Sequence, residues 1–201
     1  MKMEIYHIIH CETMPDWDRV PALEAGDIEW TEDFGIRMTQ KICYSEENLF
    51  VQQTAIERLI RAEHHEMPAA VCEDSCMEFF LVPEGDTRYL NFEWNRNGCL
   101  HLDIHAADGS GIGLLPKEHR TLFAFRSSLI ENGWQISYRI PLSFLQVFYP
   151  TLVFQPGTAF RANCYKCGDL TEHPHFLAWS KNSSETPNFH CLEDFGRMLL
   201  V

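Results

Sequence analysis

Polar and apolar side chains alternate over residues 88–95, which read R-Y-L-N-F-E-W-N. Successive side chains of an extended strand point to opposite faces, so the apolar residues share one face and Tyr89, Asn91 and Glu93 share the other. A tyrosine ring beside planar amide and carboxylate groups can stack on a sugar ring and hydrogen-bond its hydroxyls. The same side chains would also serve as an ordinary solvated face, so this segment alone leaves both interpretations open.

Two further segments repeat the pattern. Glu78 alternates with apolar residues in 75–82, and Arg161 and Asn163 alternate with apolar residues in 159–166. Carboxylate and guanidinium groups can each bond two vicinal hydroxyls with fixed geometry. We therefore predict a shallow ligand site on one polar sheet face, with Trp179 as a flat apolar platform. The candidate ligand-binding residues are Glu78, Tyr89, Asn91, Glu93, Arg161, Asn163 and Trp179. Two alternatives are that Glu78 is a buried partner of Arg161, and that Trp179 belongs to the core.

Short strand-like segments recur along the chain, separated by turns rich in Gly, Pro, Asn and Asp, which is typical of an antiparallel β-sandwich. We expect a jelly-roll or immunoglobulin-like pair of packed sheets. The predicted strands are residues 35–44, 49–54, 75–82, 88–95, 99–105, 121–126, 133–140, 159–166, 175–180 and 196–201.

One or two short helical turns interrupt the predicted strands. Residues 55–66 carry apolar side chains at helical spacing but fit a strand equally well. A turn of helix is expected from Pro141, because proline is tolerated at the first helical position. We expect a single domain over residues 1–201, in which residues 1–36 cover a sheet edge and residues 37–201 form the module itself.

The formal charge of −13 disfavours binding to nucleic acids and to anionic membrane surfaces. The sequence contains no apolar run near 18 residues, and Glu4, His7 and His10 interrupt the N-terminal region where a signal peptide needs an apolar core. We therefore expect a cytoplasmic protein, although a trimmed secreted form stays open.

The eight cysteines are expected to be free thiols in a reducing compartment, because the Cys164–Cys167 C-x-x-C has no second motif at zinc-finger spacing. An alternative is a transition-metal site. Its ligands would come from the C-terminal quarter of the chain, namely His173, His175, His190 and Cys191.

Four ordered blocks resemble the family 9 carbohydrate-binding modules, above all the free-standing family 9-like proteins of gut and soil bacteria. They read E-D-S-C-M-E-F-F-L-V-P, Y-L-N-F-E-W-N, R-A-N-C-Y-K-C-G-D-L-T-E-H-P-H-F-L-A-W-S and P-N-F-H-C-L-E-D-F-G-R-M-L-L. The resemblance covers roughly residues 37–201. It implies a β-sandwich that binds plant or host polysaccharides or their oligosaccharides in polysaccharide catabolism, often beside xylanase-type catalytic domains.

The resemblance also implies roles for particular residues. Glu78 matches the acidic position of the D-S-x-E block, and Trp179 matches one of two aromatic residues that clamp a terminal sugar. Residues 67–72, where the other should stand, contain no aromatic side chain. Tyr89, or His64 with His65, could replace it as a platform. Structural calcium is a further expectation, with carboxylates available from Asp74, Asp103, Asp108 and Asp169.

Two other functions remain open at this stage. Glu78 and Glu93 could serve as the paired carboxylates of a glycoside hydrolase, which lie about 5–5.5 Å apart in retaining enzymes and about 6.5–9.5 Å apart in inverting ones. The fold could also act as an interaction module without sugar affinity. A non-catalytic sugar-binding protein, which a separate glycoside hydrolase would accompany, agrees with more of the sequence than either alternative.

Overall fold

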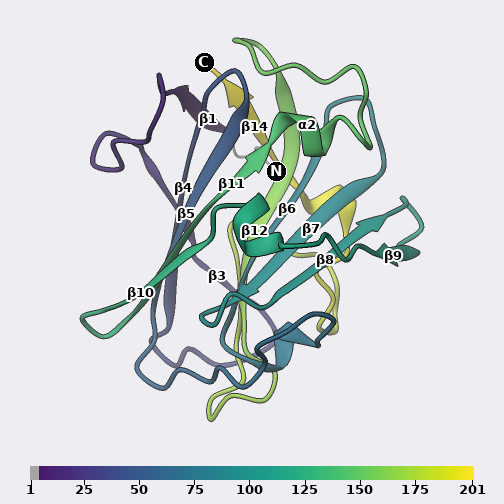
Figure 1. Cartoon of the computed structure of the whole chain (residues 1–201). Coiled ribbons are helices and arrows are strands. Elements are labelled where there is room, and N and C mark those ends of the chain that lie inside the picture. Colours follow the sequence, from purple (N-terminus) through teal and green to yellow (C-terminus); the bar gives the residue numbers. More distant parts are fainter. Residues whose placement is uncertain (1–4) are drawn as a thin grey trace.

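The computed structural model describes residues 5–201 and shows two β-sheets packed face to face (Figure 1). One sheet has the order β14-β12-β6-β7-β8-β9, with β13 on β12 and β3 on β13. Its strands are β3 (Asp27–Ile28), β6 (Cys76–Pro83), β7 (Tyr89–Asn95), β8 (Leu100–His105), β9 (Gly111–Gly113), β12 (Ala159–Cys167), β13 (Phe176–Ala178) and β14 (Gly196–Leu200). We call it the site sheet.

The second sheet has the order β10-β11-β5-β4, with β2 on β4. Its strands are β2 (Ala22–Ala25), β4 (Arg37–Tyr44), β5 (Asn48–Ile56), β10 (Arg126–Ile130) and β11 (Gly133–Pro141). Strand β1 (Ile5–His10) joins the two sheets, because it pairs in parallel with β14 over its first four residues and with β4 over its last two. The expected β-sandwich is confirmed.

The main core fills the space between the sheets with the apolar half of each alternating strand. Phe79 of β6, Phe92 and Trp94 of β7, and Trp134 and Tyr138 of β11 belong to it and are almost completely buried. Alternation therefore assigned the inward faces of β6 and β7 correctly, because the side-chain period of a strand is two.

Helical structure is confined to single turns. It comprises α1 (His119–Leu122), α2 (Leu142–Leu145) and the 3-10 turns η1 (Val71–Glu73) and η2 (Leu192–Asp194). The turn expected after Pro141 is confirmed as α2, with Pro141 as its N-cap. No helix among residues 5–201 is long and apolar enough to cross a bilayer.

Three expectations about individual segments were wrong. The strand predicted at 121–126 is largely replaced by α1 and a turn, in which Glu118 and Ala124 take positive φ. Residues 57–66 are neither helix nor strand, because β5 ends at Ile56. The segment expected to cover an edge does more than that in its described part, residues 5–36, since β1 lies between β4 and β14 and joins the two sheets.

Candidate functional site

A row of polar side chains crosses the outer face of the site sheet. Glu78 of β6 stands directly opposite Glu93 of β7, with Tyr165 of β12 opposite Glu78 on one side and His101 of β8 opposite Glu93 on the other. Directly opposed side chains on neighbouring strands lie in contact range. The register therefore brings the two carboxylates together, as the sequence pattern indicated.

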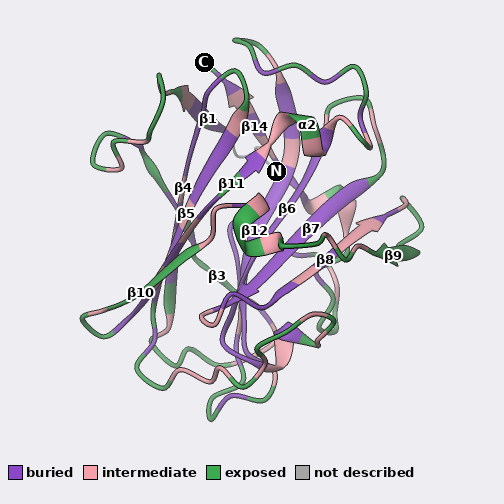
Figure 2. Cartoon of the chain, in the orientation of Figure 1, coloured by how far each residue is buried: buried purple, intermediate pink, exposed green. Residues whose placement is uncertain are grey.

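This face is not the shallow, solvated surface that we expected. Glu78 is 3% exposed and Glu93 is 7% exposed, and β6, β7 and β12 are buried along nearly their whole length (Figure 2). A second apolar cluster, which includes Phe189 and Phe195, covers the face. The prediction missed this layer because it comes from loops far away in the sequence.

Much of the cover is residues 182–195, which we call the covering segment. The backbone N–H of Asn182 donates to the buried Glu29 carboxylate at 2.8 Å. Phe189 stacks on Tyr165 with ring centroids 4.0 Å apart, and the Tyr165 hydroxyl donates to its carbonyl. Arg161 donates to the Leu192 carbonyl. These contacts attach the segment to the site sheet at several points.

Beneath the covering segment a pocket of about 350 Å³ remains, which we call the Glu78 pocket. Its polar wall comes from the sheet and the turn after β12, and comprises Glu78, Glu93, His101, Cys167 and Asp169. Its apolar wall comprises Trp30, Val71, Phe176, Pro187 and Phe189. A concave site with one apolar wall and a few convergent polar groups is typical of small-ligand binding.

The Trp30 ring is held by its neighbours on the apolar wall. Its indole N–H donates to the Ser184 carbonyl at 2.8 Å, and the ring lies 5.7 Å from Phe176 and 5.4 Å from Phe189, centroid to centroid. Trp30 lies in the segment 1–36 that was expected only to cover a sheet edge, and neither Phe176 nor Phe189 was among the predicted site residues. Only the presence of Phe189 in the P-N-F-H-C block could have signalled it.

Burial controls the charge of the polar wall. It raises the pKa of Glu93 to about 7, against the lowering effects of His101 and Asn91. Burial, followed by repulsion from Glu93, raises the pKa of Glu78 well above its ordinary value. Two facing carboxyls in a low-dielectric site resist ionising together. At neutral pH at least one of them therefore keeps its proton, so the wall offers a hydrogen-bond donor as well as acceptors.

Among the seven predicted ligand-binding residues, only Glu78 and Glu93 line the pocket. Asn91 lies beside Glu93 on the same face of β7, donating to Glu93 Oε1 at 2.7 Å and accepting from the Asp103 backbone N–H. Tyr89 is buried with its hydroxyl 2.9 Å from His190 Nδ1. These two residues support the site from within the protein.

The remaining three lie outside the pocket wall. Asn163 bonds Tyr165 and both backbone groups of Ser180, and Arg161 lies at the covering segment. The suggested pairing of Glu78 with Arg161 was wrong, because Arg161 stands opposite Val82 and Glu78 accepts from Cys167. Trp179 is 8% exposed in the main core, so the structure supports the alternative that it is a core residue.

The position of the second family aromatic is occupied by small residues. Ala70, Val71 and Cys72 line the pocket there, and none of these side chains carries a ring. Neither of the suggested replacements, Tyr89 or the pair His64 and His65, lines the pocket. The rings of the apolar wall come instead from β13, the covering segment and the loop after β3.

The structure does not form the suggested histidine metal site, and it argues against Asp74 as a calcium ligand. The histidine site does not form, because His175 is buried against Lys166 whereas His190 contacts Tyr89. Asp74 does not fit calcium, because its carboxylate oxygens accept from three N–H donors, those of Glu63, His64 and Asn95. Calcium binding through other groups stays a prediction.

A larger hollow of about 650 Å³ lies at one end of the sandwich, beside Glu57 and His173. It contains none of the seven predicted ligand-binding residues. Its carboxylate is already engaged, because Glu57 accepts from Ser75 and Trp134 and pairs with Lys166. We therefore regard the Glu78 pocket, with its two facing carboxyls and its aromatic wall, as the candidate functional site.

Comparison with known proteins gives a family and several solved structures, three of which are described here. The model of carbohydrate-binding family 9 matches residues 11–200. A candidate carbohydrate-binding protein of Bacteroides uniformis ATCC 8492 is 26% identical, with a TM-score of 0.86 and full coverage of both chains. No curated protein matches the chain.

The other two structures are a family 9 module of Caldicellulosiruptor kristjanssonii in complex with cellotriose and with glucose. Each is 13% identical with a TM-score of 0.69, and the alignments cover 98% of this chain and 93% and 96% of theirs. At this identity they show a shared fold.

Proposed function

Because the chain belongs to carbohydrate-binding family 9, we propose that it is a non-catalytic carbohydrate-binding protein whose ligand enters the Glu78 pocket. The observation that carries this proposal is that a polar wall and an apolar wall face the same pocket. Glu78 and Glu93 offer donors and acceptors to sugar hydroxyls, while Trp30 and Phe189 offer an apolar surface to the C–H face of the ring.

The pocket volume favours one sugar ring, such as the end of an oligosaccharide. At about 350 Å³ it lies near the lower limit of small-ligand pockets, which span about 300–1,000 Å³. The structures of the Caldicellulosiruptor module contain glucose and cellotriose. We therefore propose a glucose-type or related terminal residue of a plant or host polysaccharide as the ligand.

The same geometry argues against hydrolysis by this chain. Glycosidases place two carboxyls on either side of the scissile bond. Glu78 and Glu93 instead come from adjacent strands of one sheet and enter the pocket from the same wall. We propose that a separate glycoside hydrolase, of the xylanase type or another, acts on the polysaccharide that this protein binds.

Calorimetric titration with xylo-, cello-, manno- and galacto-oligosaccharides tests the proposal. We expect one class to bind, and Glu93→Gln and Trp30→Ala to weaken its affinity at least about tenfold, equivalent to about 1.4 kcal/mol. Glu131→Gln, at an exposed turn of the other sheet, is the matched control. No binding by the folded protein, or undiminished binding by both pocket variants, would overturn the assignment. Turnover that Glu78→Gln abolishes would show a hydrolase instead.

A further inference from the structure

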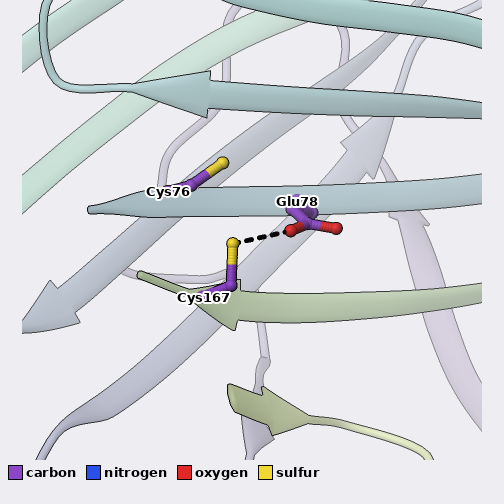
Figure 3. Close-up of side chains that lie close together, drawn as sticks. All are labelled: Cys76, Glu78 and Cys167. Atoms are coloured by element: carbon purple, nitrogen blue, oxygen red, sulfur yellow. Dashed lines mark hydrogen bonds between the residues drawn. The ribbon is translucent and has the colours of Figure 1, made fainter. Parts of the chain in front are cut away.

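Three metal-ligating side chains meet at the base of the Glu78 pocket. Cys76 of β6 and Cys167 of β12 are directly opposed in the strand register, and Glu78 follows two residues along on the same face. The two Sγ atoms and a Glu78 carboxylate oxygen all lie within 4.8 Å of one another (Figure 3). The structure thus assembles two sulfur ligands and one oxygen ligand on adjacent strands.

From this arrangement we infer that Cys76, Cys167 and Glu78 form a zinc-binding site. In the part of the chain that the structure describes, they are the one group of three His, Cys, Asp or Glu residues with ligand atoms this close. The inference does not depend on sugar binding, because it rests on the ligand atoms alone.

The spacing suits a tetrahedral ion. Bonds of about 2.3 Å to sulfur and about 2.0–2.2 Å to oxygen place the ligand atoms of a tetrahedron roughly 3.5–3.8 Å apart. The Cys167 thiol now donates to Glu78 Oε1 at 2.9 Å, so this pair would separate by less than about 1 Å to admit the ion. All three residues are buried on paired strands, which hold them near this geometry.

The ligand types favour zinc over the calcium that the family resemblance implied. Thiolates select soft or borderline ions, whereas calcium takes 6–8 oxygen ligands. When the ion binds, the two thiol protons and any proton that the Glu78 carboxyl holds leave for solvent, and the sulfurs coordinate as thiolates beside the carboxylate. Because Glu78 and Cys167 also line the pocket, the fourth coordination position faces it, where water or Cys72 could complete the tetrahedron.

Charge gives a second reason to expect a cation. Glu78 faces Glu93, and Asp169 lies on the same pocket wall, so three carboxyls share a largely buried space. Lys166, the basic residue beside Cys167, directs its ammonium group to Glu57 and His175 elsewhere. A divalent ion would compensate the carboxyls directly, since buried charges require pairing or metal coordination.

Metal titration of the reduced, chelator-stripped full-length protein tests the inference. We expect one zinc ion per chain, and a cobalt(II) derivative with sulfur-to-cobalt charge-transfer absorption and intense tetrahedral d–d bands. Cys76→Ser and Cys167→Ser should each weaken zinc binding at least about tenfold, whereas excess calcium should not displace it. Glu78→Gln keeps both sulfurs and should weaken zinc binding without abolishing the charge-transfer band.

Cys11→Ser is the matched control, because Cys11 and Cys43 also form a close thiol pair, with sulfurs 3.4 Å apart, but no third ligand from residues 5–201 joins them. Circular dichroism confirms that each variant is folded. Substoichiometric zinc, a cobalt spectrum without sulfur bands, or folded Cys76→Ser and Cys167→Ser variants that bind like the wild type would overturn the inference. So would a disulfide between Cys76 and Cys167 that persists in reductant. Sugar titration is a separate experiment, and its outcome does not decide whether zinc binds.

Discussion

The ammonium nitrogen of Lys166 lies 3.1 Å from Glu57 Oε2, and the pair joins the two sheets of the sandwich. Lys166 is on β12 of the site sheet, and Glu57 directly follows β5 of the other. Both side chains are almost completely buried. Burial alone would raise the pKa of Glu57, but the Lys166 charge and hydrogen bonds from Ser75 and Trp134 lower it, so the carboxylate stays ionised.

Lys166→Met is expected to destabilise the fold by about 3–5 kcal/mol, because it leaves a buried carboxylate without its cation. Chemical denaturation of both proteins measures the difference. The double variant Lys166→Met with Glu57→Gln should recover part of the loss, since no uncompensated charge remains. A single variant as stable as the wild type would show that the ion pair does not stabilise the fold.

The stability of the protein should fall on acidification through His175. Lys166 Nζ donates to His175 Nε2 at 2.7 Å and His175 Nδ1 donates to the His173 carbonyl at 2.7 Å, so the ring is neutral. Burial, reinforced by the Lys166 charge, lowers its pKa to about 4, against the pull of Glu57. In the unfolded chain the His175 pKa is ordinary, at about 6.5. Between about pH 6.5 and pH 4 the ring therefore binds a proton in the unfolded chain but not in the folded one.

The contribution of His175 to stability is therefore complete above about pH 6.5 and is lost progressively down to about pH 4. His175→Gln keeps an acceptor for Lys166 and removes the titration. As the pH is lowered through this window, the free energy of unfolding of His175→Gln should decrease less steeply than that of the wild type, by up to about 1.4 kcal/mol per pH unit. Denaturant titrations at several pH values measure both slopes. Equal slopes would show that His175 does not titrate as its surroundings imply.

Sequence reasoning succeeded where alternation decided the outcome. The period of two identified β6, β7, β8 and β12 and placed Glu78 and Glu93 on one face. It could not show that the covering segment buries that face, because burial there depends on contacts such as Tyr165 with Phe189 across 24 residues. It also could not show that β1 joins the sheets, since its partners β4 and β14 lie at distant positions in the chain.

Trp179 and Trp30 show the same limit of sequence reasoning. Leu177 and Trp179 face the main core, whereas Phe176 and Ala178 face the outer cluster, so one residue of register separates core from site. We expect Trp179→Ala to cost about 3–5 kcal/mol of stability, as for other large core truncations. The Trp179 ring packs directly against Gly196, and a glycine has no side chain that could fill the cavity left by removing the ring. Denaturation measures the cost.

The matched variant is Trp30→Ala, which removes a half-buried ring from the pocket wall. It should weaken sugar binding while costing less stability than Trp179→Ala. Folded Trp179→Ala protein, measured well below its denaturation midpoint, should bind sugar with nearly wild-type affinity. The reverse pattern, lost binding with intact stability in Trp179→Ala, would return Trp179 to the site.

Arg161 should act as a positioning residue for the pocket. Its guanidinium donates to the Leu192 carbonyl and thereby attaches the covering segment, which contributes Phe189 to the apolar wall. Arg161→Ala removes this hydrogen bond, which is worth about 0.5–1.5 kcal/mol. Because the segment must then be ordered when ligand binds, we expect sugar affinity to fall about two- to tenfold.

Hydrogen exchange distinguishes this role from a general loss of stability. Amides of residues 182–195 should exchange faster in Arg161→Ala, whereas those of β5 and β11 in the other sheet should keep their protection. Arg161→Lys, which retains a cationic donor, should restore part of the affinity. Unchanged exchange in the covering segment together with weakened binding would mean that Arg161 contacts the sugar itself.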